Sequence, residues 1–104
     1  ATMSFLTASY NNERTYNVVR KKAAEVIVGI NNELQKYIPN QVGKFDDSFN
    51  INCTGDYFTS KGYPTILFEA GHYLPDYQRD IVRKFVFISI KSAIFSINEN
   101  VIVL

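Results

Sequence analysis

A chain of 104 residues is long enough for a single domain with a modest hydrophobic core. Apolar residues make up 46% of the chain and charged residues 20%, and its net charge of +1 creates no field that would attract nucleic acid or an anionic membrane. Because Cys53 is the only cysteine, an intrachain disulfide and a cysteine cluster for a metal are both excluded. We therefore expect no nucleic-acid partner, no membrane partner, a small buried Cys53, and a reducing compartment such as the cytoplasm.

The first forty residues predict a strand followed by a long helix. Residues 1–6 alternate in part, with Met3 and Phe5 on one face, as in a half-buried strand. The range 13–37 carries apolar side chains at helical spacing, and Pro39 stops the helix. The apolar face consists of Val19, Ala23, Val26, Ile27, Ile30, Leu34 and Tyr37.

Polar residues set the start and the solvent side of this helix. Asn11 or Asn12 can cap its first turn. The basic cluster Arg20, Lys21 and Lys22 is expected on a solvated face, in preference to the alternative of an anion site.

The middle of the chain, residues 40–62, is rich in Asn, Asp, Gly, Ser and Thr. This composition predicts loops with little regular structure, apart from one or two helical turns over residues 56–61. Long loops in compact domains are usually functional or mobile.

The last part of the chain predicts a buried strand and a second long helix. Residues 65–68 form a nearly continuous apolar run, as in a strand covered on both faces. The helix runs from about Asp76 to Ile97, with a weak ion pair between Asp80 and Lys84. One apolar set is Ile81, Phe85, Ile88 and Phe95, and a second is Val82, Val86, Ile90, Ala93 and Ile97. Because this helix is apolar on more than one side, we expect it to be substantially buried.

The order strand, helix, long loop, strand, helix predicts an α/β fold with two long helices. The apolar residues 101–104 suggest an edge strand, a packed tail or a boundary. So few strands make a thin sheet, which resembles part of a larger one. Its exposed edge would favour self-association or domain swapping.

A glutamate follows the apolar strand directly. Binding sites in open α/β sheets lie beyond the carboxyl ends of the strands, which is where Glu69 is expected. A carboxylate held there can take a proton from water at neutral pH. The alternative is a surface glutamate that pairs with a nearby Lys or Arg.

The only histidine, His72, lies three residues beyond Glu69. Two candidate ligands are too few for a zinc site, and Gly71 argues against a helix that would align them. Asp46 and Asp47 suit loop solvation better than cation binding. We therefore expect no metal ligands in this chain.

Residues 55–90, GDYFTSKGYPTILFEAGHYLPDYQRDIVRKFVFISI, resemble the C-terminal part of the catalytic domain of zinc metallocarboxypeptidases of the carboxypeptidase A-like class. The parallels are an Asp-aromatic pair at Asp56-Tyr57, a strand that ends in Phe68-Glu69, and a long final helix. The resemblance extends, less sharply, over nearly the whole chain. It implies a partial mixed sheet and identifies the chain as the C-terminal third of such a domain.

The resemblance also implies roles for residues. Glu69 would be the general base that activates water for attack on a C-terminal peptide bond, and His72, Tyr73 and Asp56 would border the substrate pocket. The family binds zinc through a His-x-x-Glu motif and a second histidine that precede the region matched here, so no zinc ligand is carried over. The implied partners are the missing N-terminal part of the domain and a peptide substrate, and these 104 residues alone would bind no cofactor and be inactive.

Two other hypotheses remain open. The first is a stand-alone, non-catalytic interaction module that associates through its sheet edge. The second is a small metal site built across a dimer from Glu69, His72 and loop carboxylates.

Overall fold

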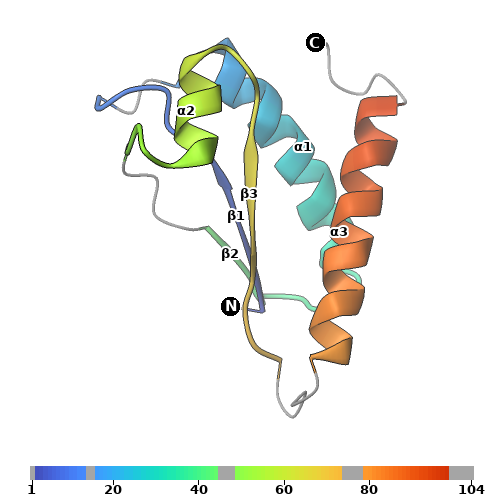
Figure 1. Ribbon diagram of the computed structural model, residues 1–104. Coiled ribbons are helices and arrows are strands. Elements are labelled where there is room, and N and C mark those ends of the chain that lie inside the picture. Colours follow the sequence, from blue (N-terminus) through green and yellow to red (C-terminus); the bar gives the residue numbers. More distant parts are fainter. Residues whose placement is uncertain (1, 14–15, 45–48, 74–78, 99–104) are drawn as a thin grey trace.

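The computed structural model describes residues 2–13, 16–44, 49–73 and 79–98, which form a mixed sheet with helices packed on it (Figure 1). In chain order the elements are β1 (Met3–Thr7), α1 (Val18–Leu34), β2 (Val42–Lys44), α2 (Thr54–Ser60), β3 (Ile66–Ala70) and α3 (Asp80–Asn98). The α/β class and the first strand are therefore confirmed. The predicted helix start at Asp76, the Asp46-Asp47 pair and residues 101–104 lie outside the described residues.

The sheet has the order β2-β1-β3, in which the central β1 is parallel to β2 and antiparallel to β3. Its register places Phe5 opposite Phe68 and Ser4 opposite Glu69. The rings of Phe5 and Phe68 meet edge-on with their centroids 5.3 Å apart. The prediction of loops over residues 40–62 is wrong at β2, because a strand of three residues is too short to show a period-two pattern.

One face of the sheet carries the hydrophobic core, where α1 and α3 pack against β1 and β3. The buried members of this core are Met3, Phe5, Val26, Ile30, Leu34, Ile38, Val82 and Phe85. On the opposite face, called the outer face below, Leu67 is 40% exposed and Glu69 is also exposed. The expectation that this strand is covered on both faces is therefore wrong, since both long helices pack on the same side.

The helix α1 is shorter than the predicted range 13–37. Its N-cap is Asn17, whose Oδ1 accepts a hydrogen bond from the Arg20 N–H at 3.1 Å, so the caps predicted at Asn11 or Asn12 are wrong. The helix ends at Leu34, and Tyr37 beyond it is 51% exposed.

The helix α3 turns only part of its predicted apolar surface to the core, including Val82 and Phe85. Its buried residues are Val82, Phe85, Ser89 and Ser96. The Oγ of Ser89 donates to the Phe85 carbonyl at 2.7 Å, which explains how a serine can be fully buried without losing a hydrogen bond. Phe95 is 63% exposed. The prediction of a substantially buried helix is wrong.

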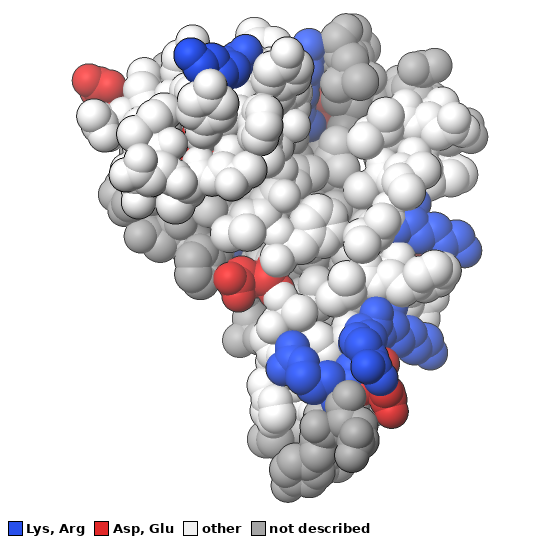
Figure 2. Space-filling view, viewed as in Figure 1, with Lys and Arg blue, Asp and Glu red and all other residues white. Residues whose placement is uncertain are grey.

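The solvent side of α3 combines apolar and basic residues. Arg83, Lys84 and Lys91 are exposed, and Figure 2 shows basic side chains gathered at the lower right, over this helix. Asp80 pairs with Arg83, whereas an ion pair with Lys84 was predicted. Exposed pairs of this kind contribute little to stability.

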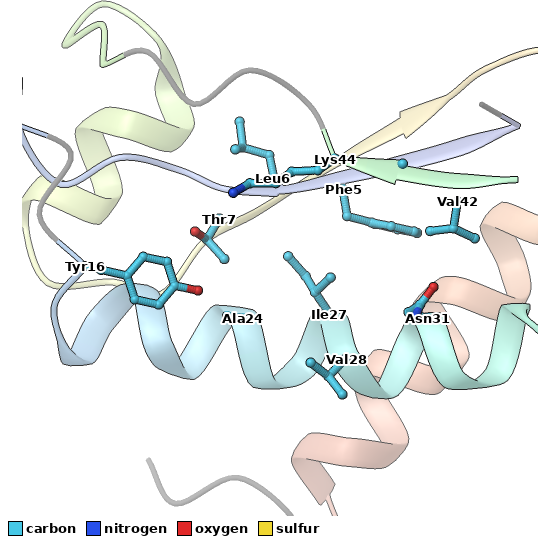
Figure 3. A pocket seen from close by; sticks show the side chains of 11 residues that line it. Phe5, Leu6, Thr7, Tyr16, Ala24, Ile27, Val28, Asn31, Val42 and Lys44 are labelled. Atoms are coloured by element: carbon cyan, nitrogen blue, oxygen red, sulfur yellow. The ribbon is translucent and has the colours of Figure 1, made fainter. Parts of the chain in front are cut away.

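The outer face of the sheet is contacted by α2 near the start of β3. Figure 3 shows Phe5 pointing toward α1 and Leu6 pointing to the other side of the sheet. Gly55 in α2 lies so close that a Cβ placed on it would be 3.6 Å from the Cβ of Ala8. Cys53 caps α2 with an extended backbone and is exposed, so the prediction that it is buried is wrong.

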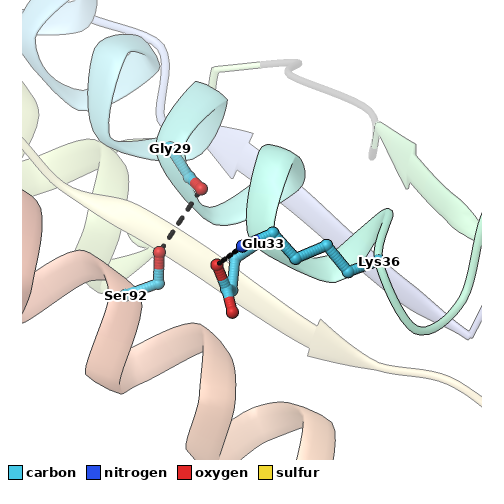
Figure 4. Close-up of polar contacts among 4 residues, drawn as sticks. All are labelled: Gly29, Glu33, Lys36 and Ser92. Atoms are coloured by element: carbon cyan, nitrogen blue, oxygen red, sulfur yellow. Dashed lines mark hydrogen bonds and ion pairs between the residues drawn. The ribbon is translucent and has the colours of Figure 1, made fainter.

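The two long helices pack closely against each other at Gly29. A Cβ placed on Gly29 would lie 2.8 Å from the Oγ of Ser96, and the Oγ of Ser92 donates to the Gly29 carbonyl at 3.3 Å (Figure 4). Small side chains on both helices therefore set their separation.

Another polar contact joins Glu33 of α1 to Lys36, just beyond the helix. Glu33 accepts a hydrogen bond from Lys36 at 3.0 Å, which raises the pKa of the exposed Lys36 amine.

The contact between Gly29 and Ser96 predicts that Gly29→Ala has opposite effects on the free energy of unfolding in two backgrounds. Gly29→Ala should lower the free energy of unfolding by about 1 kcal/mol, because overpacking against Ser96 outweighs the gain in helix propensity. In a Ser96→Ala background the same substitution should raise it by about 0.5–1 kcal/mol, since the clashing oxygen is gone. Urea denaturation of the four proteins measures both effects, and an equal effect in both backgrounds would contradict the contact.

Candidate functional site

Glu69 lies near the carboxyl end of β3, with its exposed side chain on the outer face. Its direct neighbour in the antiparallel ladder is Ser4 on β1. No Lys or Arg within the described ranges lies at ion-pair distance from it, so the alternative of a paired surface glutamate finds no partner there. The carboxylate is thus held by a strand and open to whatever approaches this face.

The two residues that were predicted beside Glu69 lie in different surroundings. His72 is exposed directly after the strand, whereas Tyr73 is half-buried and packs on the core. The ring of Tyr73 meets that of Phe85 at a centroid distance of 6.0 Å. Tyr73 therefore helps to fix the chain after β3, and only His72 stays available to a ligand near this end of the sheet.

Asp56 lies at the opposite end of β3. It is 8% exposed, and its Oδ2 accepts a hydrogen bond from the Asn50 N–H at 2.6 Å. It lines a cavity of about 770 Å³ on the outer face together with Thr65, four residues before Glu69. The same cavity reaches Leu67, which lies two residues before Glu69 on the same face of β3, whereas Glu69 itself does not line it.

A second cavity, of about 390 Å³, lies between α1 and the β2 side of the sheet (Figure 3). Its walls are mainly apolar, with polar groups from Tyr16, Asn31 and Lys44. None of the predicted site residues lines it.

Arg20 was missed by the sequence analysis. It is 2% exposed, its Nε donates to the Thr7 Oγ1 at 3.0 Å, and its Nη2 donates to the Thr7 carbonyl at 3.0 Å. The expectation that Arg20 is solvated is wrong. A signal was present, since Arg20 precedes the buried Ala23 by three residues and so falls on the core side of α1.

The described residues do not fit a zinc ion. Across the described ranges, no three His, Cys, Asp or Glu side chains come together as a metal site requires. Asp56, which the resemblance groups with Glu69 and His72, lines a cavity that neither of those two residues lines. None of the helices in the described part of the chain is long and apolar enough to cross a membrane.

Comparison with known proteins adds no relative. No protein-family model matches the chain, and neither the curated proteins nor the solved structures contain a match. The resemblance to zinc carboxypeptidases therefore rests on the residues quoted for it alone.

Proposed function

We propose that this chain forms part of the catalytic domain of a zinc-dependent carboxypeptidase-like hydrolase, which removes C-terminal residues from peptides or amino-acid conjugates. The observation that carries the proposal is the position of Glu69, which is exposed at the carboxyl end of a strand without a cationic partner among the described residues. Because β3 runs antiparallel to β1 and β2, this end of β3 lies beside their amino ends. The proposal therefore depends on the carboxylate itself, which a rigid strand holds where it can accept a proton from water.

The order of elements supports the same proposal. The Asp56-Tyr57 pair lies on the short helix α2, the Phe68-Glu69 pair lies on β3, and α3 packs across the sheet. These are the local structures that the resemblance implies for the three motifs. The outer edge of β2, which pairs only with β1 among the described residues, agrees with a sheet that continues beyond this chain.

In the proposed reaction, Glu69 takes a proton from the attacking water and passes it to the leaving amine. His72 is close enough in sequence and exposed enough to border the substrate beside it. Zinc would polarise the scissile carbonyl, but its ligands would have to come from residues other than the described ones. The 104 residues alone are therefore expected to show no hydrolysis.

The edge of β3, which no other described strand covers, also favours a second candidate function, a non-catalytic module that binds through its sheet edge. This candidate does not require Glu69. Hydrolysis by the full gene product would distinguish the two proposals, because only the first requires it.

The test compares two substrates for the full product of the source gene. A peptide with a free C-terminal carboxylate should lose its last residue at least about 100-fold faster than the same peptide amidated, because a site built for that group rejects an analogue without it. A zinc chelator should abolish the release. Equal rates on both peptides, or full activity after metal removal, would contradict the proposed function.

A further inference from the structure

The outer edge of β3 presents main-chain groups that pair with no other strand in the described part of the chain. The Gly71 N–H donates to the Thr2 carbonyl at 2.8 Å, and the Ala8 N–H donates to the Thr65 carbonyl at 3.4 Å. Because hydrogen-bonded pairs alternate along an antiparallel ladder, residues 65, 67, 69 and 71 turn their backbone groups toward β1. Residues 66, 68 and 70 therefore turn theirs outward.

Of these three residues, only Ala70 has an acceptor already in use. Its carbonyl receives a hydrogen bond from the Arg79 Nη2 at 3.1 Å. The outward N–H and C=O groups of Ile66 and Phe68 have no partner within the described ranges. Such a row of free donors and acceptors is a template for another strand.

The helix α3, which contacts β3, carries an exposed apolar stripe. The stripe consists of Phe87, Ile90, Ile94 and Ile97, which are 65%, 46%, 62% and 45% exposed. Their spacing of three and four residues places them along one side of the helix. An exposed surface of this length on a soluble domain marks an interaction site.

The stripe and the edge belong to one continuous surface. Ile97 and Ile66 line the same small cavity, together with Pro64. The region between β3 and α3 carries few charged side chains in Figure 2. We name this surface, formed by the outward edge of Ile66 and Phe68 and by the apolar stripe, the edge surface.

We propose that the edge surface binds a second copy of this chain in a two-fold dimer. A helix or a loop would cover the stripe but leave the main-chain groups of β3 unpaired, whereas a second edge surface supplies both a strand and an apolar stripe. Antiparallel pairing of β3 with its copy joins the two sheets into one, and keeps the helices on one side of it. The two α3 stripes then meet beneath the new ladder, which satisfies the requirement that a two-fold interface be self-complementary.

Chemistry selects one register for this pairing. With Phe68 opposite the Phe68 of the copy, the outward groups of residues 66, 68 and 70 all find partners, and Leu67 faces the Glu69 of the copy on the outer face. Moving the register by one step places Glu69 opposite itself, where like charges repel. Moving it the other way brings Pro64, which has no N–H, into the ladder.

The inference rests on the edge geometry and not on the hydrolase proposal, since it is tested on the 104-residue chain without any substrate. Analytical ultracentrifugation over a concentration series gives the dissociation constant of the dimer. Ile94→Glu should raise it about 100-fold, because two charges enter the stripe contact, whereas Val28→Glu on α1, also more than half exposed, should leave it unchanged.

A matched pair of variants tests the register. Leu67→Glu would face Glu69 of the copy twice per dimer and should raise the dissociation constant about tenfold, whereas Leu67→Lys would face it with the opposite charge and should leave the constant within about threefold. Both variants lose the same apolar group, and circular dichroism checks that all variants stay folded. A chain that is monomeric at all concentrations, a dimer insensitive to Ile94→Glu, or equal effects of the two Leu67 variants would overturn the proposal.

Discussion

Glu69→Gln in the full gene product should lower kcat/KM for a peptide with a free C-terminal carboxylate by about 10²–10⁴-fold. Glutamine keeps the size of the side chain but cannot accept a proton, so the loss falls on the transition state. It corresponds to about 3–5 kcal/mol of activation free energy. Because Glu69 is exposed on the outer face and contributes no ion pair within the described ranges, KM and the fold should change little. Steady-state kinetics with the purified variant measures kcat and KM separately.

Two further variants decide whether the loss is specific. Glu69→Asp keeps the carboxylate but shortens its reach by one methylene, and should retain part of the activity. Glu25→Gln, an exposed position on α1, makes the same change in charge far from the outer face and should leave kcat/KM unaltered. Activity of Glu69→Gln within about threefold of the unmodified protein would remove Glu69 from the mechanism.

Apolar periodicity was sufficient to predict the elements whose core contacts are made by large side chains. The first strand and α1 follow from alternation around Met3 and Phe5 and from the run that includes Ile30 and Leu34, all of which are buried. The boundaries of α1 were less accurate, because several asparagines near its start could each act as a cap, and only Asn17 does.

The orientation of α3 could not be predicted in this way. Its contact with α1 uses Ser92 and Ser96 opposite Gly29, so a close contact between the two helices is made by residues that hydrophobicity classes as polar or neutral. Several large apolar side chains of the helix, such as Phe87 and Ile94, are left exposed. Sequence patterns report how apolar a face is, but the separation between helices is decided by side-chain size.

The candidate site, too, could be predicted from the sequence only in part. Glu69 could be placed at a strand end from the sequence, because the apolar run and the residue after it are adjacent in the chain. The grouping of Asp56 with Glu69 depends instead on a tertiary arrangement, since Asp56 lies on α2 and Glu69 lies near the end of β3. Groups contributed by other parts of a larger domain would be needed to complete a catalytic site around Glu69.

Arg20→Met should lower the free energy of unfolding by about 3 kcal/mol. Arg20 joins the first turn of α1 to the end of β1 through its two hydrogen bonds to Thr7, and both residues are buried. Hydrogen bonds from a charged donor contribute about 1.5–3 kcal/mol each, and the acceptors on Thr7 would be left without this partner. Methionine keeps the apolar stem, so the loss reports on the guanidinium rather than on packing. Urea denaturation followed by circular dichroism measures the change.

The matched control is Lys21→Met, which removes a positive charge from the next, exposed residue and should change stability by less than about 0.5 kcal/mol. Arg20→Lys retains the charge but loses the planar fork that reaches both oxygens of Thr7, and should fall between the two. If Arg20→Met proves too unstable to purify, Arg20→Lys alone still decides the matter, because a solvated arginine would tolerate lysine without loss. Unchanged stability of Arg20→Lys would mean that the buried contact to Thr7 does not stabilise the fold, and that the apolar core alone holds α1 to β1.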